Sequence, residues 1–318
     1  MTPSDIFLLI FAIVTVLAAL AAILTLIFAY YAYRRVFTLK NRHPDPKRGV
    51  EKPSCLPYRD FIVPIIERMT GEKYEDLYVT SHDGLRLHAK YYKGENGKPV
   101  EIMLHGYKST PTRDCCGSGS DVIDAGGGLL YVEQRAHGDS EGKTITFGVL
   151  ERHDLLLWIN KILEIEGKDT KIIVHGTSMG GATALMASGL DLPENVRCII
   201  VDCPYSEPRE IIESVLNSMK LPPRLVYPFI KLGAKIYGGF DLDGASADEA
   251  IAKTKTPIFI MHGDGDTFVP MYMSEALYKK YPDKVDFLSF KGADHCMSFL
   301  MYPEEYRRAR DEFRAKHL

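Results

Sequence analysis

The first hydrophobic segment of the chain runs from Ile6 to Tyr33 without a charged residue and consists mainly of Leu, Ile, Ala, Val and Phe. A helix rises 1.5 Å per residue, so about 20 apolar residues cross a ~30 Å hydrocarbon core. We therefore predict a short tail at residues 1–5 and a transmembrane helix at residues 6–33. A cleavable signal peptide is the alternative, but its n-region would carry positive charge, whereas this flank holds Asp5 and no Lys or Arg.

Beyond this segment, hydrophobic positions group into short runs typical of buried strands, and stretches with helical spacing separate most of them. An opening hairpin comes first, and the later strands alternate with helices, as in a sheet covered on both faces. The predicted fold class is therefore α/β, with a mostly parallel eight-stranded sheet. Its strands are expected at residues 77–80, 86–92, 100–104, 129–133, 171–175, 198–202, 257–262 and 285–290.

Two further segments follow from composition. Residues 34–58 are rich in proline and charge and lack apolar periodicity, so we predict a linker that wraps onto a single domain at residues 59–318. The sixth and seventh strands are separated by far more than a usual connection. Apolar residues within about 204–254 recur at helical spacing on segments broken by Pro222-Pro223 and Gly238-Gly239, which predicts a helical insertion.

Positive charge is concentrated directly after the apolar segment, at Arg34, Arg35, Lys40, Arg42, Lys47 and Arg48. Residues 1–50 carry +4, which leaves −7 on the remainder of a chain whose net charge is −3. The positive-inside rule places the basic side, and all that follows it, in the cytoplasm. Anionic headgroups would attract the basic cluster, whereas the acidic remainder argues against nucleic-acid binding.

No cofactor or metal is expected. The adjacent Cys115 and Cys116 suit no disulfide framework, and the chain has no C-x-x-C pair, so all six cysteines are predicted to be reduced and not to bind metal. Asp241-x-Asp243-Gly244 lacks the closing Glu of a calcium loop. The glycine-rich residues 121–128 are expected to be only the turn into the fourth strand, and the oligomeric state is left open.

A candidate nucleophile follows the fifth strand. Gly176-Thr177-Ser178-Met179-Gly180 is a G-x-S-x-G sequence on a predicted strand-to-helix turn, which would hold the Ser178 hydroxyl up and exposed. Gly176 and Gly180 are needed because this turn crowds the backbone. Serine is also favoured at helix N-caps, and this is the structural alternative for Ser178.

The partners of such a serine would be a base and a group that orients it. The loop after the seventh strand holds Asp264 and Asp266, and the loop after the eighth holds Asp294 and His295. Asp264 and Asp294 compete with Asp266 for the acid position, while His295 is the expected base. Four other histidines are expected to make structural hydrogen bonds: His105, His137, His175 and His262.

These segments resemble the α/β-hydrolase superfamily over roughly residues 75–316, since the chain order is Ser, Asp, His. The closest resemblance is to its serine-aminopeptidase-like or lysophospholipase-like branch. That branch has an R-G-H-G-x-S-x-G loop where this chain has Gln134-Arg135-Ala136-His137-Gly138-Asp139-Ser140-Glu141-Gly142. Ala136 replaces the usual glycine and Glu133 a common aspartate.

The resemblance also implies roles. Asp266 matches the acid of the family's G-x-x-D-x-x-V-P pattern, and His105-Gly106-Tyr107 stands where the family keeps its oxyanion loop. The backbone N–H groups of Tyr107 and Met179 would then hold the oxyanion. Insertions at about 204–254 commonly form a cap over the active site in this superfamily. Most of its apolar residues are expected to pack on the domain, with an acyl-binding groove or bilayer contact as the alternative.

Together these expectations describe a membrane-anchored serine hydrolase acting on a small-molecule or lipid ester through an acyl-enzyme. Ser178 would attack the carbonyl, His295 would act as base and then acid, and Asp266 would fix the tautomer of His295. Amide or peptide hydrolysis and acyl transfer stay open as alternatives. A catalytically silent membrane scaffold with the same fold is the non-enzyme alternative.

Overall fold

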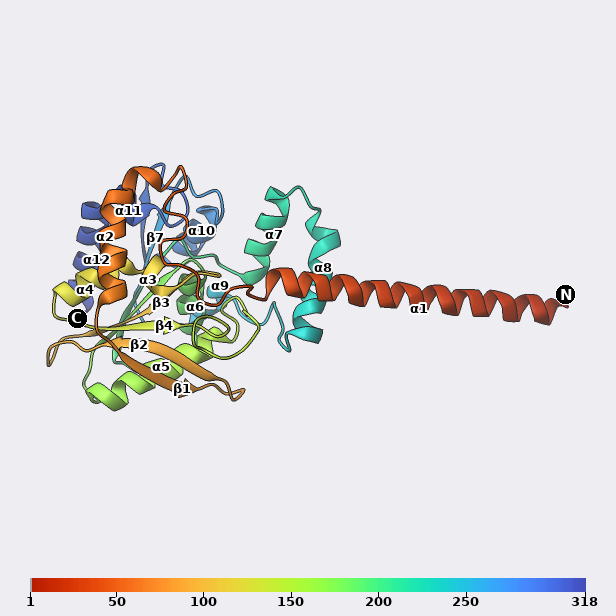
Figure 1. Ribbon diagram of the computed structural model, residues 1–318, viewed down its shortest axis with the longest axis horizontal. Helices are drawn as coiled ribbons and strands as arrows, with labels where there is room; N and C mark the ends of the chain where they lie inside the picture. The colour runs from red at the N-terminus through yellow and green to blue at the C-terminus, as the bar shows by residue number, and fades with distance from the viewer. Residues whose placement is uncertain (1) are drawn as a thin grey trace.

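Eight strands form one sheet in the order β1-β2-β4-β3-β5-β6-β7-β8 in the computed structural model, which describes residues 2–318 (Figure 1). β2 is antiparallel to both of its neighbours, and all later neighbours are parallel. This confirms the predicted sheet, and each strand lies within two residues of its expected bounds. The strands are β1 (Glu75–Thr80), β2 (Arg86–Tyr92), β3 (Val100–Leu104), β4 (Gly128–Glu133), β5 (Ile172–Thr177), β6 (Val196–Asp202), β7 (Ile258–Gly263) and β8 (Val285–Phe290).

Helices cover both faces of the sheet because parallel strands need crossover connections. One face is packed by side chains of α5, α6, α9 and α10, and the other by side chains of α2, α4, α11 and α12. These helices are α2 (Arg59–Gly71), α4 (Cys116–Asp124), α5 (Glu151–Glu166), α6 (Met179–Ala187), α9 (Ala247–Lys253), α10 (Tyr272–Lys280), α11 (Ser298–Met301) and α12 (Pro303–His317). The one-turn helix α3 (Pro111–Asp114) precedes α4. α4 continues through Asp124, so the turn expected at residues 121–128 is shorter than predicted.

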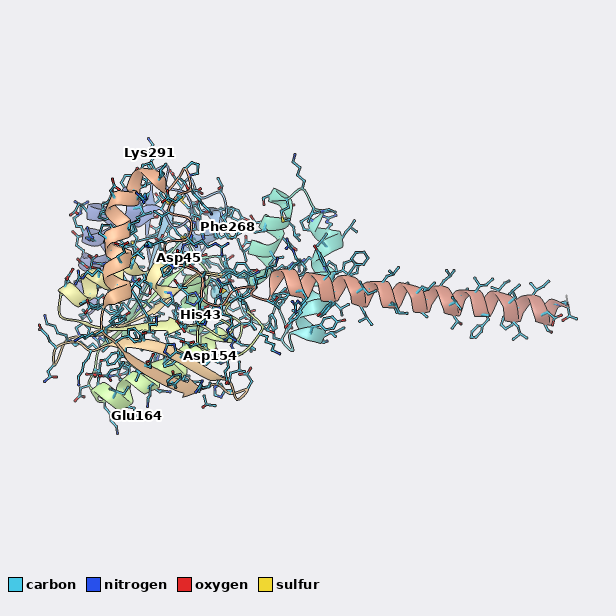
Figure 2. The ribbon with its side chains drawn as sticks, viewed as in Figure 1. His43, Asp45, Asp154, Glu164, Phe268 and Lys291 are labelled. Carbon is cyan, nitrogen blue, oxygen red and sulfur yellow. The ribbon has the colours of Figure 1, made fainter. Side chains whose placement is uncertain are left out.

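The long helix α1 (Pro3–Val36) projects away from the sheet domain (Figure 1). Thr2 and Asp5 form a capping box at its first turn, which satisfies backbone donors there. Apolar side chains project from it on all sides along most of its length (Figure 2), and one 18-residue window reaches a mean hydropathy of 3.1. This length and composition suffice to cross a membrane, and signal sequences share both.

The segment after α1 lies on the sheet domain. Phe37 is fully buried, with its ring edge-on to Phe147 and Phe240 at centroid distances of 5.7 and 5.4 Å. The guanidinium of Arg42 donates hydrogen bonds to the carbonyl groups of Gly138, Ser140 and Gly142. The short 3-10 helix η1 (Leu56–Tyr58) then leads into α2.

The insertion between β6 and β7 contains α7 (Pro208–Ser218) and α8 (Pro223–Tyr237), which lie beside the domain-proximal part of α1 (Figure 1). Phe229 of α8 packs on Phe28 of α1 at 5.8 Å between ring centroids. A Cβ on Gly233 would lie 2.5 Å from the Ala29 carbonyl oxygen, so this glycine permits the close approach of the two helices. The insertion and the apolar helix therefore form one packed unit.

Candidate active site

Ser178 lies on the sharp turn between β5 and α6. Its backbone has φ 54° and ψ −116°, a conformation that non-glycine residues rarely adopt. A Cβ on Gly180 would lie 2.1 Å from the Leu104 carbonyl oxygen, and one on Gly176 would lie 2.4 Å from the Gly180 carbonyl oxygen. Both glycines are therefore required by contact with backbone atoms, as the motif predicts.

The structure brings Ser178, His295 and Asp266 together as one hydrogen-bonded chain. The Nε2 atom of His295 lies 2.9 Å from the Ser178 Oγ, and its Nδ1 atom lies 2.7 Å from Asp266 Oδ2. An ionised carboxylate can only accept, so in the neutral imidazole Nδ1 carries the proton and Nε2 is free to accept the serine hydroxyl. This is the geometry needed to activate a serine.

Asp266 is held in place by several donors. Its Oδ1 accepts the backbone N–H groups of Phe268 at 2.9 Å and Val269 at 2.8 Å, and the Nε2 of His262 lies 3.3 Å from Oδ2. Burial alone would raise the pKa of Asp266, but hydrogen bonds with His262, His295 and Val269 hold that pKa below its ordinary value. The carboxyl group is therefore ionised at neutral pH.

The two competing carboxylates have other partners. Asp294 accepts the backbone N–H of Thr267 at 3.0 Å and its hydroxyl at 3.1 Å, and Asp264 accepts the N–H of Gly292. Within residues 2–318, neither carboxylate is hydrogen-bonded to the imidazole of His295. The tertiary structure thus selects Asp266 from the three candidates.

The candidate oxyanion loop runs past the serine. A Cβ on Gly106 would lie 3.3 Å from Ser178 Cβ, and the Gly106 N–H donates to Asp114 Oδ2 at 2.7 Å. Across residues 2–318, the N–H groups of Tyr107 and Met179 donate to no other protein group, which leaves both available for a ligand. This contact of Asp114 with the loop was not expected from the sequence, because Asp114, on the short helix α3 (Pro111–Asp114), belongs to no recognised motif.

The four histidines expected to be structural are all buried, and one of them, His262, contacts Asp266. His105 and His137 each accept a backbone N–H through Nε2, from Gln134 and Lys108 respectively. His262 bridges the Ser274 hydroxyl and the Val269 carbonyl group, and His175 lies 3.4 Å from the Tyr306 hydroxyl. None of these four is hydrogen-bonded to Ser178 within the described chain.

A pair of thiols beside the imidazole was missed by sequence reasoning. Cys203 Sγ lies 3.5 Å from Cys296 Sγ, although the residues are 93 positions apart. A hydrogen bond from Cys203 and the positive charge of His295 lower the pKa of Cys296 to about 6, against the effect of burial. Burial alone would lower the pKa of His295, but the Cys296 charge and Asp266 raise it well above its ordinary value.

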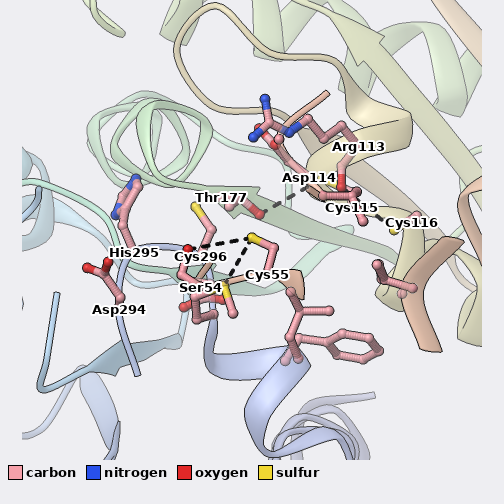
Figure 3. A pocket seen from close by; sticks show the side chains of 18 of the residues that line it. Ser54, Cys55, Arg113, Asp114, Cys115, Cys116, Thr177, Asp294, His295 and Cys296 are labelled. Carbon is pink, nitrogen blue, oxygen red and sulfur yellow. Dashed lines mark hydrogen bonds between the residues drawn. The ribbon is translucent and has the colours of Figure 1, made fainter. Parts of the chain in front are cut away.

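A cavity of 370 Å³ borders this region, and Figure 3 shows His295, Cys296, Thr177 and Cys115 around it. Apolar side chains of α2 and of the segment after α1 line its other side. All six cysteines of the chain are free thiols in this structure.

The end of α1 contacts the candidate oxyanion loop. The Tyr107 hydroxyl donates a hydrogen bond to the Val36 carbonyl group, and Lys108 Nζ donates to the Arg35 carbonyl oxygen at 3.0 Å. The apolar helix, the insertion and the loop beside Ser178 are thus in direct contact.

Comparisons with known proteins agree with this architecture. No family model matches the chain. The chain is 29% identical over 196 residues to the uncharacterized protein YqkD of Bacillus subtilis, covering 60% of this chain and 63% of that protein. It is 28% identical over 196 residues to the lysophosphatidylserine lipase ABHD12 of Danio rerio, covering 58% of this chain and 47% of that protein. The chain therefore spans about half to two thirds of the length of these relatives.

Solved structures share the fold at greater coverage. The esterase Pf2001 of Pyrococcus furiosus superposes with a TM-score of 0.62 at 24% identity, over 77% of this chain and 91% of that chain. Est1E of Butyrivibrio proteoclasticus, solved with ferulic acid, superposes with a TM-score of 0.59 at 20% identity, over 76% and 98%. At this level of identity the likeness establishes the fold alone.

Proposed function

Because the chain has the α/β-hydrolase fold, we propose that it is a serine hydrolase that cleaves carboxylic esters, with Ser178 as nucleophile, His295 as base and Asp266 as the orienting acid. The observation that carries the proposal is the chain of two hydrogen bonds, of 2.9 and 2.7 Å, through the imidazole of His295. Relatives described as an esterase and as a lipase support the choice of ester over amide.

The proposed reaction has two stages. His295 Nε2 takes the proton of Ser178 Oγ as that oxygen attacks the ester carbonyl, and the tetrahedral oxyanion accepts hydrogen bonds from the N–H groups of Tyr107 and Met179. His295 then gives the proton to the leaving alkoxide, and an acyl-enzyme remains. Water, deprotonated by His295, attacks the acyl-enzyme and releases the carboxylic acid and free Ser178.

We further propose that α1 anchors the protein in a membrane and that the substrate is a lipid or other acyl ester drawn from that membrane. The helix is apolar on all sides, and such a helix is stable only when buried in protein or in a bilayer. Its end touches Tyr107, the proposed oxyanion donor, so the reaction centre would lie near the bilayer surface. Arg34 and Arg35 in its last turn support a cytoplasmic side for the domain.

The decisive experiment is labelling of the detergent-solubilised full chain with a fluorophosphonate, which reacts with activated serines. Labelling is expected for the wild type and should be lost in Ser178→Ala. The matched control is Ser188→Ala, at the other end of α6, where the hydroxyl donates only to the Leu185 carbonyl group. Equal labelling of wild type and Ser178→Ala would overturn the proposal.

Topology and substrate class need separate measurements. An epitope placed after Leu318 should resist protease in intact cells and become sensitive once the membrane is permeabilised. A panel of matched acyl esters and amides should show faster turnover of the esters. Sensitivity in intact cells would contradict the cytoplasmic side, and faster amide turnover would favour an amidase.

A further inference from the structure

Two thiols and the imidazole of the proposed base form a compact cluster that the ester reaction does not use. Cys203 follows the end of β6, and Cys296 follows His295 directly. One ligand atom from each of Cys203, His295 and Cys296 lies within 4.8 Å of the other two. Thiolate sulfur and imidazole nitrogen are the donors that Zn²⁺ and related soft cations prefer.

The spacing of the sulfur atoms suits a metal ion better than a covalent bond. With Zn–S bonds of about 2.3 Å, tetrahedral geometry places two sulfur ligands roughly 3.8 Å apart. A disulfide would need about 2.05 Å. The observed separation of Cys203 Sγ and Cys296 Sγ is 3.5 Å, so metal binding requires the smaller displacement.

A second observation concerns Asp202, the residue before Cys203. The Asp202 side chain is only 4% exposed, and its Oδ1 atom has no hydrogen-bond partner within residues 2–318. Asp202 lines the 370 Å³ cavity together with His295 and Cys296. A buried carboxyl oxygen without a hydrogen-bond partner is costly unless a cation, a proton or water satisfies it. The cavity also has room for a water molecule as a fourth ligand.

We propose that Cys203, Cys296 and His295 form an inhibitory site for a soft divalent cation such as Zn²⁺, with the Asp202 carboxylate beside it. Both cysteines bind as thiolates, and the protons held by the thiols and by the coordinating imidazole nitrogen are released to solvent as the metal bonds form. No oxidation is involved. The cation alone is enough to assemble the site.

Inhibition follows from the geometry and rests on the proposed hydrolase function. Both ring nitrogens of His295 are engaged, Nδ1 with Asp266 and Nε2 with Ser178. A metal ion must take one of these nitrogens and so break one of the two hydrogen bonds. Loss of either removes the base or its orientation.

Metal binding can be tested without any activity. Cd²⁺ added to the detergent-solubilised full chain should produce the ultraviolet absorption of a cadmium–thiolate bond, saturating at one equivalent. Cys203→Ser and Cys296→Ser should each lower this absorption at least twofold, because each removes one of the two thiolates. The matched control is Cys198→Ser. Cys198 is also buried, and it lies on β6, the strand that ends one residue before Cys203.

A second readout guards against misfolded variants. Cd²⁺ should protect Cys296 of the wild type from alkylation by iodoacetamide, as measured by mass spectrometry. The site would be overturned if Cd²⁺ changed neither the absorption nor the alkylation of the wild type. It would also be overturned if Cys203→Ser and Cys198→Ser showed equal Cd²⁺ absorption.

Inhibition by the cation is tested in a separate experiment. Micromolar Zn²⁺ should lower the rate of fluorophosphonate labelling at least tenfold, Mg²⁺ should leave it unchanged, and a chelator should restore it. Cys203→Ser should be labelled at the same rate with and without Zn²⁺. Cd²⁺ binding without labelling in any condition would refute the proposed hydrolase function, whereas labelling that Zn²⁺ never slows would refute inhibition.

Discussion

At the scale of single residues, His295 is the group whose protonation would control the reaction. Four titratable groups lie around its cluster. Asp266 and Cys296 raise the pKa of His295, Asp202 interacts electrostatically with His295, and His262 contacts Asp266 at 3.3 Å. As a base, His295 must be neutral in the free enzyme. Raising its pKa therefore extends the inactive, protonated form toward higher pH.

The pH dependence of kcat/KM should show this directly. With soluble ester, we expect the acidic limb of the wild type to have its midpoint above pH 6.5, the ordinary pKa of histidine, with about a tenfold fall per pH unit below the midpoint. Cys296→Ala removes a neighbouring negative charge and should move the midpoint to lower pH. Cys198→Ala is the control. If the midpoint of the acidic limb is the same in Cys296→Ala as in the wild type, the prediction is contradicted.

The nucleophile turn depends on contacts that a single methyl group would break. Gly180→Ala should destabilise the chain by about 3 kcal/mol or more, because its Cβ would lie 2.1 Å from the Leu104 carbonyl oxygen, a backbone atom. Gly71→Ala at the end of α2 is the control, since nothing lies within 4 Å of its added Cβ. Urea unfolding of the solubilised proteins measures the difference, and equal midpoints for the two variants would refute the steric argument.

At the scale of elements, a buried ion pair joins the loop after β4 to α5. Arg135 makes two hydrogen bonds to Asp154, of 2.7 and 2.8 Å, and both side chains are almost fully buried. Burial raises the pKa of Asp154 to about 6 despite this partner. Asp83, which is half exposed, also contacts the guanidinium at 3.0 Å. The pair positions the loop that resembles a family motif.

Removing one member of this pair should lower the free energy of unfolding far more than removing one member of a surface pair on the same helix. Asp154→Ala leaves Arg135 buried with only the exposed Asp83 as partner, so we expect a loss of about 3 kcal/mol in the free energy of unfolding. Glu164→Ala is the control, because Glu164 lies on α5 in an exposed pair with Lys161 (Figure 2). Its effect should stay within about 0.5 kcal/mol. Thermal or urea unfolding separates the two, and comparable losses would contradict the account.

At the scale of the whole molecule, the apolar helix, the insertion and the candidate active site are in contact. α8 packs on the last turns of α1, and α1 ends against Tyr107 beside Ser178. Exposed apolar side chains continue along the insertion: Met219, Leu221, Leu225, Ile236 and Tyr237. Such a surface next to the proposed membrane anchor is suited to contact the bilayer.

The double variant Leu225→Asp with Ile236→Asp tests this surface. Each side chain transferred to lipid contributes roughly 1.5–3 kcal/mol, so turnover of an ester embedded in vesicles should fall at least about tenfold. Turnover of a water-soluble ester should be unchanged. Ile165→Asp is the control, because Ile165 is 39% exposed on α5, remote from α1 (Figure 1). Equal losses on both substrates would indicate damage to the fold, and no loss on vesicles would refute bilayer contact.

Much of the architecture could be read from local patterns. Strand positions follow from runs such as residues 171–175 and 257–262, whose burial depends on hydrophobicity alone. The turn at Ser178 is equally local, because five consecutive residues contain its glycines and its hydroxyl. The helix α4 was not predicted from the sequence. The glycines and serines of residues 117–120 have low helix propensity, and packing against the sheet stabilises the helix there.

The sequence by itself determined the α/β sheet, the apolar helix and the loops in which an acid and a base could lie, since these depend on neighbouring residues. Only the tertiary structure decided that Asp266 rather than Asp264 or Asp294 pairs with His295, that Cys203 meets Cys296, and that α1 ends on the candidate oxyanion loop. These contacts join residues distant along the chain. Their distances are set by how the strands and helices pack, which no local pattern encodes.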